Sequence, residues 1–406
     1  MHERTLALCE SLNFREWSGY YAVSSYEGHH EHEYNAIRNQ AALIDVSPLF
    51  KYLIRGRDAA VLIDRVITRD ATKLNVGQVW YTPWCDEQGK VIDDGTVTRV
   101  SEHEFRLTAA DPSLRWLGEN AAGLSVGLDD ISDRVAALAI QGPTSGPLLN
   151  VVTDGAVASL KYFRMTRAAI GGVPVEISRT GYTGDLGYEI WMPWERALDV
   201  WDALIEGGQA FGIHPAGMLA LDVARIEAGL LLIDVDFSSS RRAVIASQLY
   251  SPFELGLGRL VSLDKGPFVG RRALIEEHRR GEARRIVGLE IGWTAVEQLY
   301  ERRGMAPEIP ATASRVAVPV YRDGRQVGRA TSTTWSPVLK KLIALATLDA
   351  PHFREGTVVD FEVTVDAVRH RVPATVVPTP FFNPARKTVT PAGSERTRPT
   401  PRSEPT

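Results

Sequence analysis

Cysteine and long apolar runs are both scarce in this sequence of 406 residues. The two cysteines, Cys9 and Cys85, cannot build the disulfide framework of a small secreted protein or a four-cysteine zinc site. So low a cysteine content suits a reducing compartment. No apolar run reaches the roughly 18 residues of a membrane span, and the charged first segment, MHERTLALCESLNFREW, lacks the apolar core of a signal peptide. We therefore expect a cytoplasmic protein without a membrane span.

An excess of charge of one sign is also lacking, since 46 basic residues stand against 50 acidic residues and leave a formal charge of -4. Without a net basic field, the chain has no general attraction for nucleic acid.

Common catalytic signatures are absent as well. No GxGxxG segment follows a strand-like run, no GxSxG occurs, and Gly142–Gly146 lacks the lysine of a phosphate loop. The segment His29–His32 lacks the i, i+4 spacing of a zinc-binding helix, so we predict a solvated loop there and no metal site.

The body of the chain mixes strand-like and helix-like segments, and its 44% hydrophobic content is enough for two to four domains. VPVEIS alternates like a strand, whereas PWERALDVWDALIEGGQ and MLALDVARIEAGLLL have helical spacing. Late in the chain, RVAVPVY, RQVGRAT, LIALATL, TVVDFEV and HRVPATVV predict a small antiparallel sheet or barrel. We predict an α+β region over residues 1–280, a β domain over 281–386, and a disordered spacer over 387–406, which has four prolines and no aromatic residue.

The first candidate site is the acidic pair Asp93-Asp94, which follows an apolar pair and a turn. Adjacent side chains on an extended chain point to opposite faces, so one carboxylate can face a cavity while the other is solvated or caps the turn. By itself the pair equally fits a turn exit with two solvated acids. Trp80 and Tyr81 lie nearby in sequence and fit either a hydrophobic core or the walls of a site for a flat ring.

The second candidate site is the glycine-punctuated segment RTGYTGDLGYE, residues 179–189. Its glycines permit positive φ and close backbone approach. Glu189 lies in an apolar run, where a carboxylate needs a donor. A ligand with two parallel N–H donors, such as an aminopyrimidinone edge, would satisfy it, and so would an internal pair with Arg179 or Arg225.

Seven segments, in the same order along the chain to about residue 386, resemble the glycine-cleavage T-protein (aminomethyltransferase) superfamily. They are EYNAIRNQAALIDVS, WYTPWCDEQGKVIDD, ALAIQGPTS, SRTGYTGDLGYEIWMP, ARIEAGLLL, SPFELGLGRLVSLDKGPFVGRRAL and GRATSTTWSPVLKKLIALATL. The resemblance implies an α+β fold of three domains arranged as a cloverleaf around a central channel, with a small barrel-like domain last. It also implies tetrahydrofolate as the cofactor in that channel.

The same resemblance assigns roles to five residues. Asp94 matches the family's catalytic aspartate, and Tyr81 matches a folate-contacting tyrosine. Tyr182 and Glu189 match the tyrosine of the RTGYTG segment and the glutamate that binds the pterin. Arg225 matches the arginine of the helix that ends in EAG.

Several positions depart from the T-protein pattern. Pro48-Leu49 replaces His-Met after the DVS segment, Thr108 replaces an asparagine, and Gly95 replaces a bulky aliphatic residue. We place these departures on the donor side of the channel, whereas the pterin-side motifs persist. We therefore predict a tetrahydrofolate-dependent one-carbon transferase of the demethylase type, acting on a small methylated donor.

Three alternatives remain open. A true T-protein would transfer an aminomethyl group and would meet a lipoyl carrier protein. A non-catalytic folate-binding protein is the second, although Lys265–Arg272 lacks the cysteine of the iron–sulfur-cluster maintenance branch. An oxidase subunit is the third, and it would need a separate flavoprotein.

Overall fold

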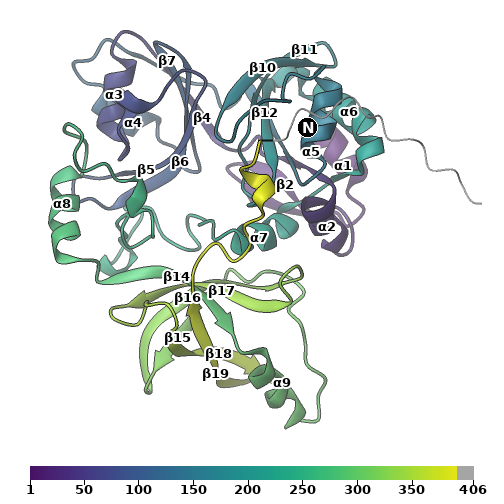
Figure 1. The fold of residues 1–406 in the computed structure, drawn as a ribbon, viewed down its shortest axis with the longest axis vertical. Coiled ribbons are helices and arrows are strands. Elements are labelled where there is room, and N and C mark those ends of the chain that lie inside the picture. Colours follow the sequence, from purple (N-terminus) through teal and green to yellow (C-terminus); the bar gives the residue numbers. More distant parts are fainter. Residues whose placement is uncertain (391–406) are drawn as a thin grey trace, which may run out of the picture. The chain divides into compact units, whose positions relative to one another are not determined.

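The computed structural model describes residues 1–390, which form two compact units (Figure 1). The first unit consists of Met1–Pro48, Ser132–Ala220 and the described residues from Pro384 onward. The second consists of Leu49–Ile131 and Leu221–Asn383. Both units contain helices and sheets, so the predicted α+β class is confirmed. Within residues 1–390, no helix is long and apolar enough to cross a membrane.

The first unit is built on a six-stranded sheet with the order β10-β11-β12-β9-β3-β13, and a separate hairpin joins β1 to β2. Its strands are β1 Asn13–Trp17, β2 Tyr20–Ser25, β3 Ala41–Asp45, β9 Val135–Gln141, β10 Met165–Ile170, β11 Val173–Ser178, β12 Gly187–Pro193 and β13 Ile213–Pro215. Its helices are α1 His2–Leu8, α2 Glu31–Asn39, α5 Ser145–Val152 and α6 Ala197–Gly208.

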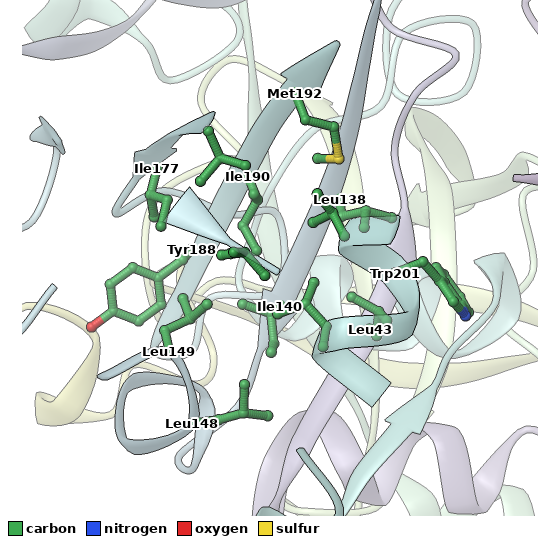
Figure 2. Close-up of a cluster of buried hydrophobic side chains, with 14 of the residues drawn as sticks. Leu43, Leu138, Ile140, Leu148, Leu149, Ile177, Tyr188, Ile190, Met192 and Trp201 are labelled. Atoms are coloured by element: carbon green, nitrogen blue, oxygen red, sulfur yellow. The ribbon is translucent and has the colours of Figure 1, made fainter. Parts of the chain in front are cut away.

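Figure 2 shows the core of this unit, where side chains from the sheet meet helices α5 and α6. Cross-strand register pairs Leu43 with Ile140 and Leu138 with Ile190, so side chains of three strands line one face. Trp201 of α6 covers them and is only 1% exposed. The predicted apolar spacing of α6 is confirmed, because Ala197, Val200, Trp201 and Leu204 are all buried.

The second unit begins with a five-stranded sheet of order β5-β6-β7-β4-β8. Helices α3 and α4 share a core with this sheet, in which Trp84 and Trp116 stack with ring centroids 6.3 Å apart. The elements are β4 Phe50–Arg55, α3 Ala59–Val66, β5 Val79–Cys85, β6 Val91–Ser101, β7 Glu104–Ala109, α4 Leu114–Asn120 and β8 Gly127–Asp130.

The remainder of the second unit contains a closed barrel of order β14-β17-β16-β15-β18-β19, drawn in green to yellow in Figure 1. All five late strand-like segments form strands of this barrel, whereas β14 escaped sequence analysis. The elements are α8 Arg271–Arg280, β14 Arg284–Ile291, α9 Trp293–Glu301, β15 Val318–Arg322, β16 Arg325–Ser336, β17 Lys341–Asp349, β18 Val358–Val365 and β19 Val368–Val377.

Helix α7, Met218–Glu227, begins in the first unit and ends in the second. Gly229, two residues after the end of this helix, has a φ of 63°, a left-handed conformation typical of the end of a helix. Short 3₁₀ helices complete the structure: η1 Ala71–Lys73, η2 Trp194–Arg196, η3 Gln209–Phe211, η4 Ala246–Gln248, η5 Gly258–Leu260 and η6 Ala385–Lys387.

The predicted division of the chain at residues 280 and 281 stays a prediction. Of the predicted disordered spacer over 387–406, residues 391–406 lie outside the described residues.

Truncating the core of the first unit tests this packing. Leu138→Ala removes a fully buried side chain and leaves a cavity, so we expect the free energy of unfolding to fall by about 2–5 kcal/mol. Val151→Ala is the control, because Val151 is 54% exposed and its loss is expected to cost no more than about 0.5 kcal/mol. Chemical denaturation measures both values, and equal losses would contradict the packing described.

Candidate functional site

Two predicted site residues, Tyr81 and Asp94, meet on neighbouring strands of the second unit. Strands β5 and β6 are antiparallel, and Tyr81 lies opposite Thr96, two residues beyond Asp94. Side chains two residues apart share a face of the sheet, so Tyr81 reaches diagonally toward the carboxylate. Its hydroxyl donates to Asp94 Oδ2 at 2.6 Å.

Asp93 occupies the opposite face of the same strand and is fully buried. Its carboxylate accepts the backbone N–H groups of Asp94, Ala110 and Asp111 at 2.8, 3.0 and 2.9 Å. Burial raises the pKa of Asp93 well above its usual range, the Asp94 carboxylate raises it further, and backbone donors oppose the rise. These contacts join β6 to the end of β7, an arrangement that suits a structural role for Asp93.

Asp94 is half-buried, and its surroundings raise the pKa of its carboxyl group toward neutral pH. Burial raises the pKa of Asp94 to about 6, the Tyr81 hydroxyl acts against this rise, and the Asp236 carboxylate adds to it. A carboxyl group with such a pKa exchanges protons readily at physiological pH.

Arg225, the third predicted residue of this unit, lies in a buried ion pair that the sequence did not reveal. Its Nη1 donates to Asp236 Oδ2 at 2.6 Å, both side chains are fully buried, and its Nη2 donates to Ser332 Oγ at 2.8 Å. Asp236 Oδ1 also accepts the hydroxyls of Thr331 and Ser332, each at 2.6 Å. The register of β16 shifts between Ala330 and Ser332, and a bulge of this kind redirects side chains. The network therefore joins α7 to the barrel.

The remaining predicted residues, Tyr182 and Glu189, lie in the first unit and are each half-buried. Glu189 is on β12, and Thr180 Oγ1 donates to its Oε2 at 2.5 Å. Arg179, one of the two arginines considered as its partner, donates to main-chain carbonyls, including that of Leu160 at 3.1 Å. Arg225, the other, contacts Asp236 as described.

Glycines let the loop between β11 and β12 close over Gln141. A Cβ atom at Gly181 or at Gly187 would lie 2.1 Å from Gln141 Oε1, so a larger residue at either position would displace the buried Gln141 side chain. The Gln141 amide donates to the carbonyls of Thr180 and Tyr188, each at 3.3 Å. The glycine spacing of this segment is thus a packing requirement that shapes the loop carrying Tyr182.

One departure from the T-protein pattern has a packing cause. A Cβ at Gly95 would lie 2.0 Å from the Thr108 carbonyl oxygen and 3.2 Å from the ring of Trp84, which is fully buried. Gly95 therefore packs against the core residue Trp84, and its place on the donor side of the channel stays a prediction. Thr108 pairs with Thr96 and shares the face of Tyr81 and Asp94.

Comparison with known proteins agrees with this fold. The GCVT N-terminal domain family matches residues 2–265, and the glycine cleavage T-protein C-terminal barrel domain family matches residues 301–383. The solved glycine cleavage system aminomethyltransferase T from Bartonella henselae has the same fold, with a TM-score of 0.78 and 23% identity over 94% of this chain and 96% of that chain. The chain belongs to the glycine cleavage T-protein family and is an enzyme of this class.

Two relatives of known name are similar over most of the chain. An aminomethyltransferase of Caldanaerobacter subterraneus subsp. tengcongensis is 35% identical over 334 residues, which cover 81% of this chain and 82% of the relative. A trimethylamine-oxide aldolase of Ruegeria pomeroyi is 38% identical over 404 residues, which cover 95% of this chain and 47% of the relative. The chain thus spans about half the length of the aldolase.

Removing the Tyr81 hydroxyl tests the electrostatics of Asp94. Tyr81→Phe deletes the donor that stabilises the carboxylate, so we expect the pKa of Asp94 to rise above about 6. Carbon-13 NMR titration of labelled aspartate side chains measures this pKa, and Asp94→Asn assigns the signal. Tyr321→Phe, which removes a hydroxyl from Glu362 on the barrel, is the matched control and is expected to change nothing at Asp94.

The substitution Asp236→Asn is expected to shift the pKa of Asp94 in the opposite direction. It removes the negative charge that raises the pKa of Asp94, so the pKa is expected to fall. A shift of both variants in the same direction would refute the assigned causes.

Proposed function

We propose that this enzyme transfers a one-carbon unit, at the methyl or methylene level, from a small methylated donor to tetrahydrofolate. The observation that carries the proposal is the half-buried Asp94 carboxyl, which accepts the Tyr81 hydroxyl and has a pKa raised to about 6. The match to a trimethylamine-oxide aldolase is 38% identical and covers 95% of this chain. This similarity supports a methylated amine as the donor class.

The side chains present suit a reduced pterin. Glu189 offers a half-exposed carboxylate beside the glycine-shaped loop, and a carboxylate matches the paired N–H donors of a pterin edge. Tyr182 lies in the same loop and offers a ring for stacking. For Arg225, the contacts with Asp236 and Ser332 favour a supporting role over a direct contact with folate.

When bound, tetrahydrofolate supplies a nucleophilic ring amine that accepts the one-carbon unit. Ionised Asp94 would accept the proton that the amine loses on alkylation, while the electron pair of the broken bond to carbon would stay on the donor heteroatom, which leaves with the demethylated donor. The Tyr81 hydroxyl keeps the carboxylate oriented for that transfer. Glu189 and Tyr182 fix the orientation of the acceptor, which lowers the entropic cost of bringing two partners together.

A second candidate is aminomethyl transfer from a lipoyl carrier protein, with release of ammonia. The similarity to the Caldanaerobacter aminomethyltransferase, which covers 82% of that relative, supports this second candidate. Thr108, in place of the family's asparagine on the face of Asp94, favours the demethylase-type reaction instead. The enzymatic relatives argue against the non-catalytic alternative.

Asp94→Asn is expected to lower turnover by about 10²- to 10⁴-fold while leaving folate affinity nearly unchanged, because the amide cannot accept a proton. The assay offers tetrahydrofolate with trimethylamine oxide, other methylated amines, sulfonium compounds, methoxyarenes or an aminomethyl-lipoyl carrier, and identifies the folate product. 5-Methyltetrahydrofolate indicates methyl transfer, and 5,10-methylenetetrahydrofolate with ammonia indicates the aminomethyl reaction. Asp129→Asn, which changes an exposed carboxylate paired with Arg55, is the control.

The pH dependence provides a further check on the same residue. Wild-type turnover is expected to fall as the pH falls through about 6, since protonated Asp94 accepts no proton. Equal turnover of wild type and Asp94→Asn would remove Asp94 from the mechanism, and no folate product with any donor would refute the proposed function.

Glu189→Ala is expected to weaken tetrahydrofolate binding by about tenfold or more, since a charge-assisted hydrogen bond is lost. Isothermal titration calorimetry measures the dissociation constant. Glu176→Ala on neighbouring strand β11, which removes a carboxylate from the exposed pair with Arg167, is the control. Unchanged affinity of Glu189→Ala would reassign this carboxylate to an internal structural role.

A further inference from the structure

The glycine-rich loop that carries Tyr182 is contacted by a segment some 200 residues later in the chain. Arg386 Nε donates to Asp185 Oδ1 at 2.6 Å, and its Nη2 donates to Asp185 Oδ2 at 2.8 Å. The Asp185 side chain is fully buried, and this paired geometry is the strongest that an arginine forms with a carboxylate. We call residues 384–390 the terminal segment.

A second arginine makes contacts in the opposite direction, from the loop to the terminal segment. Arg179, at the start of the loop, is fully buried. Its Nη2 lies within hydrogen-bond distance of the carbonyl oxygens of Arg386, Lys387 and Val389, at 3.2, 3.2 and 2.7 Å. The terminal segment therefore contacts the loop near both of its ends.

Helix α2 completes this cluster through Arg38. Its Nη1 lies 3.3 Å from Asp185 Oδ2 and 3.0 Å from the Thr183 carbonyl oxygen, to which it donates. Arg386 Nη2 also donates to the Arg38 carbonyl at 3.1 Å. Two guanidinium groups thus compensate one buried carboxylate, and the loss of either leaves a buried charge poorly compensated.

We propose that Arg386 is a positioning residue of the folate site, acting through Asp185 on the loop that carries Tyr182 and leads into the strand of Glu189. This inference rests on the proposed function. Three glycines within seven residues give the loop little conformational preference of its own, so outside contacts must select its conformation. Arg386 supplies some of those contacts, beside those of Arg38 and Gln141, and contributes to folate affinity by ordering the loop.

The test uses full-length protein with Arg386→Ala. We expect faster hydrogen exchange of the backbone amides of residues 180–187, with the barrel unchanged, and a dissociation constant for tetrahydrofolate raised by about tenfold or more. Turnover at saturating folate is expected to change far less. Arg386→Lys keeps the charge but loses the paired geometry, so it is expected to restore part of the affinity. Arg196→Ala, which removes an exposed ion pair with Asp199 in the same unit, is the matched control.

Two outcomes would overturn the inference: exchange and affinity equal to those of Arg196→Ala, or exchange that increases evenly over the whole unit. The latter would make Arg386 a general stabilising residue. If wild-type protein binds no tetrahydrofolate, the proposed function fails, whereas the exchange of residues 180–187 still decides whether Arg386 orders the loop.

Discussion

A carboxylate that leaves water must be met by hydrogen-bond donors, and this requirement fixes how distant segments of the chain come together. Asp93 takes three backbone N–H groups, two of them from the end of β7. Asp236 takes the Arg225 guanidinium together with two hydroxyls of the barrel strand β16. Asp185 takes Arg386 and Arg38. Asp236 and Asp185 therefore join segments that local secondary structure alone would leave unconnected, whereas Asp93 reinforces the pairing of β6 with β7.

Asp94 differs from these acids because it is only half-buried. Its neighbour Asp93 has the same chemistry one residue earlier, yet the alternation of the strand turns it into the core and surrounds it with backbone donors. On the other face, Asp94 meets the hydroxyl of Tyr81 and the field of Asp236, which act on its pKa in opposite directions. One strand thus carries a structural acid and a titratable acid side by side, and the buried one orients the segment on which the other works.

The sequence predicted the elements and the motifs better than the contacts between them. Alternation and turn residues identified five of the six barrel strands, and helical spacing identified α6. The motif that pointed to Asp94 and Tyr81 lies on two neighbouring strands, so its members meet in space. Arg386 and Asp185 are 201 residues apart, and no local pattern relates them. At Gly95, the sequence showed a departure from the family pattern but not the close contact with Trp84 that the fold makes there.

Relatives with this fold include both an aminomethyltransferase and a trimethylamine-oxide aldolase, so one fold carries different reactions. In the proposed mechanism, Asp94 and Tyr81 serve the step that every donor shares, which is the removal of a proton from the folate amine as it is alkylated. Gly95, one of the departures from the family pattern, packs against the core residue Trp84. Thr108 differs, because it lies on the Asp94 face and its hydroxyl is 2.5 Å from that of Thr96. The row that runs from Tyr81 through Thr96 to Thr108 thus carries a hydroxyl pair at the position where the resemblance to the T-protein pattern predicts an asparagine. Discrimination between donors is therefore best sought in this row.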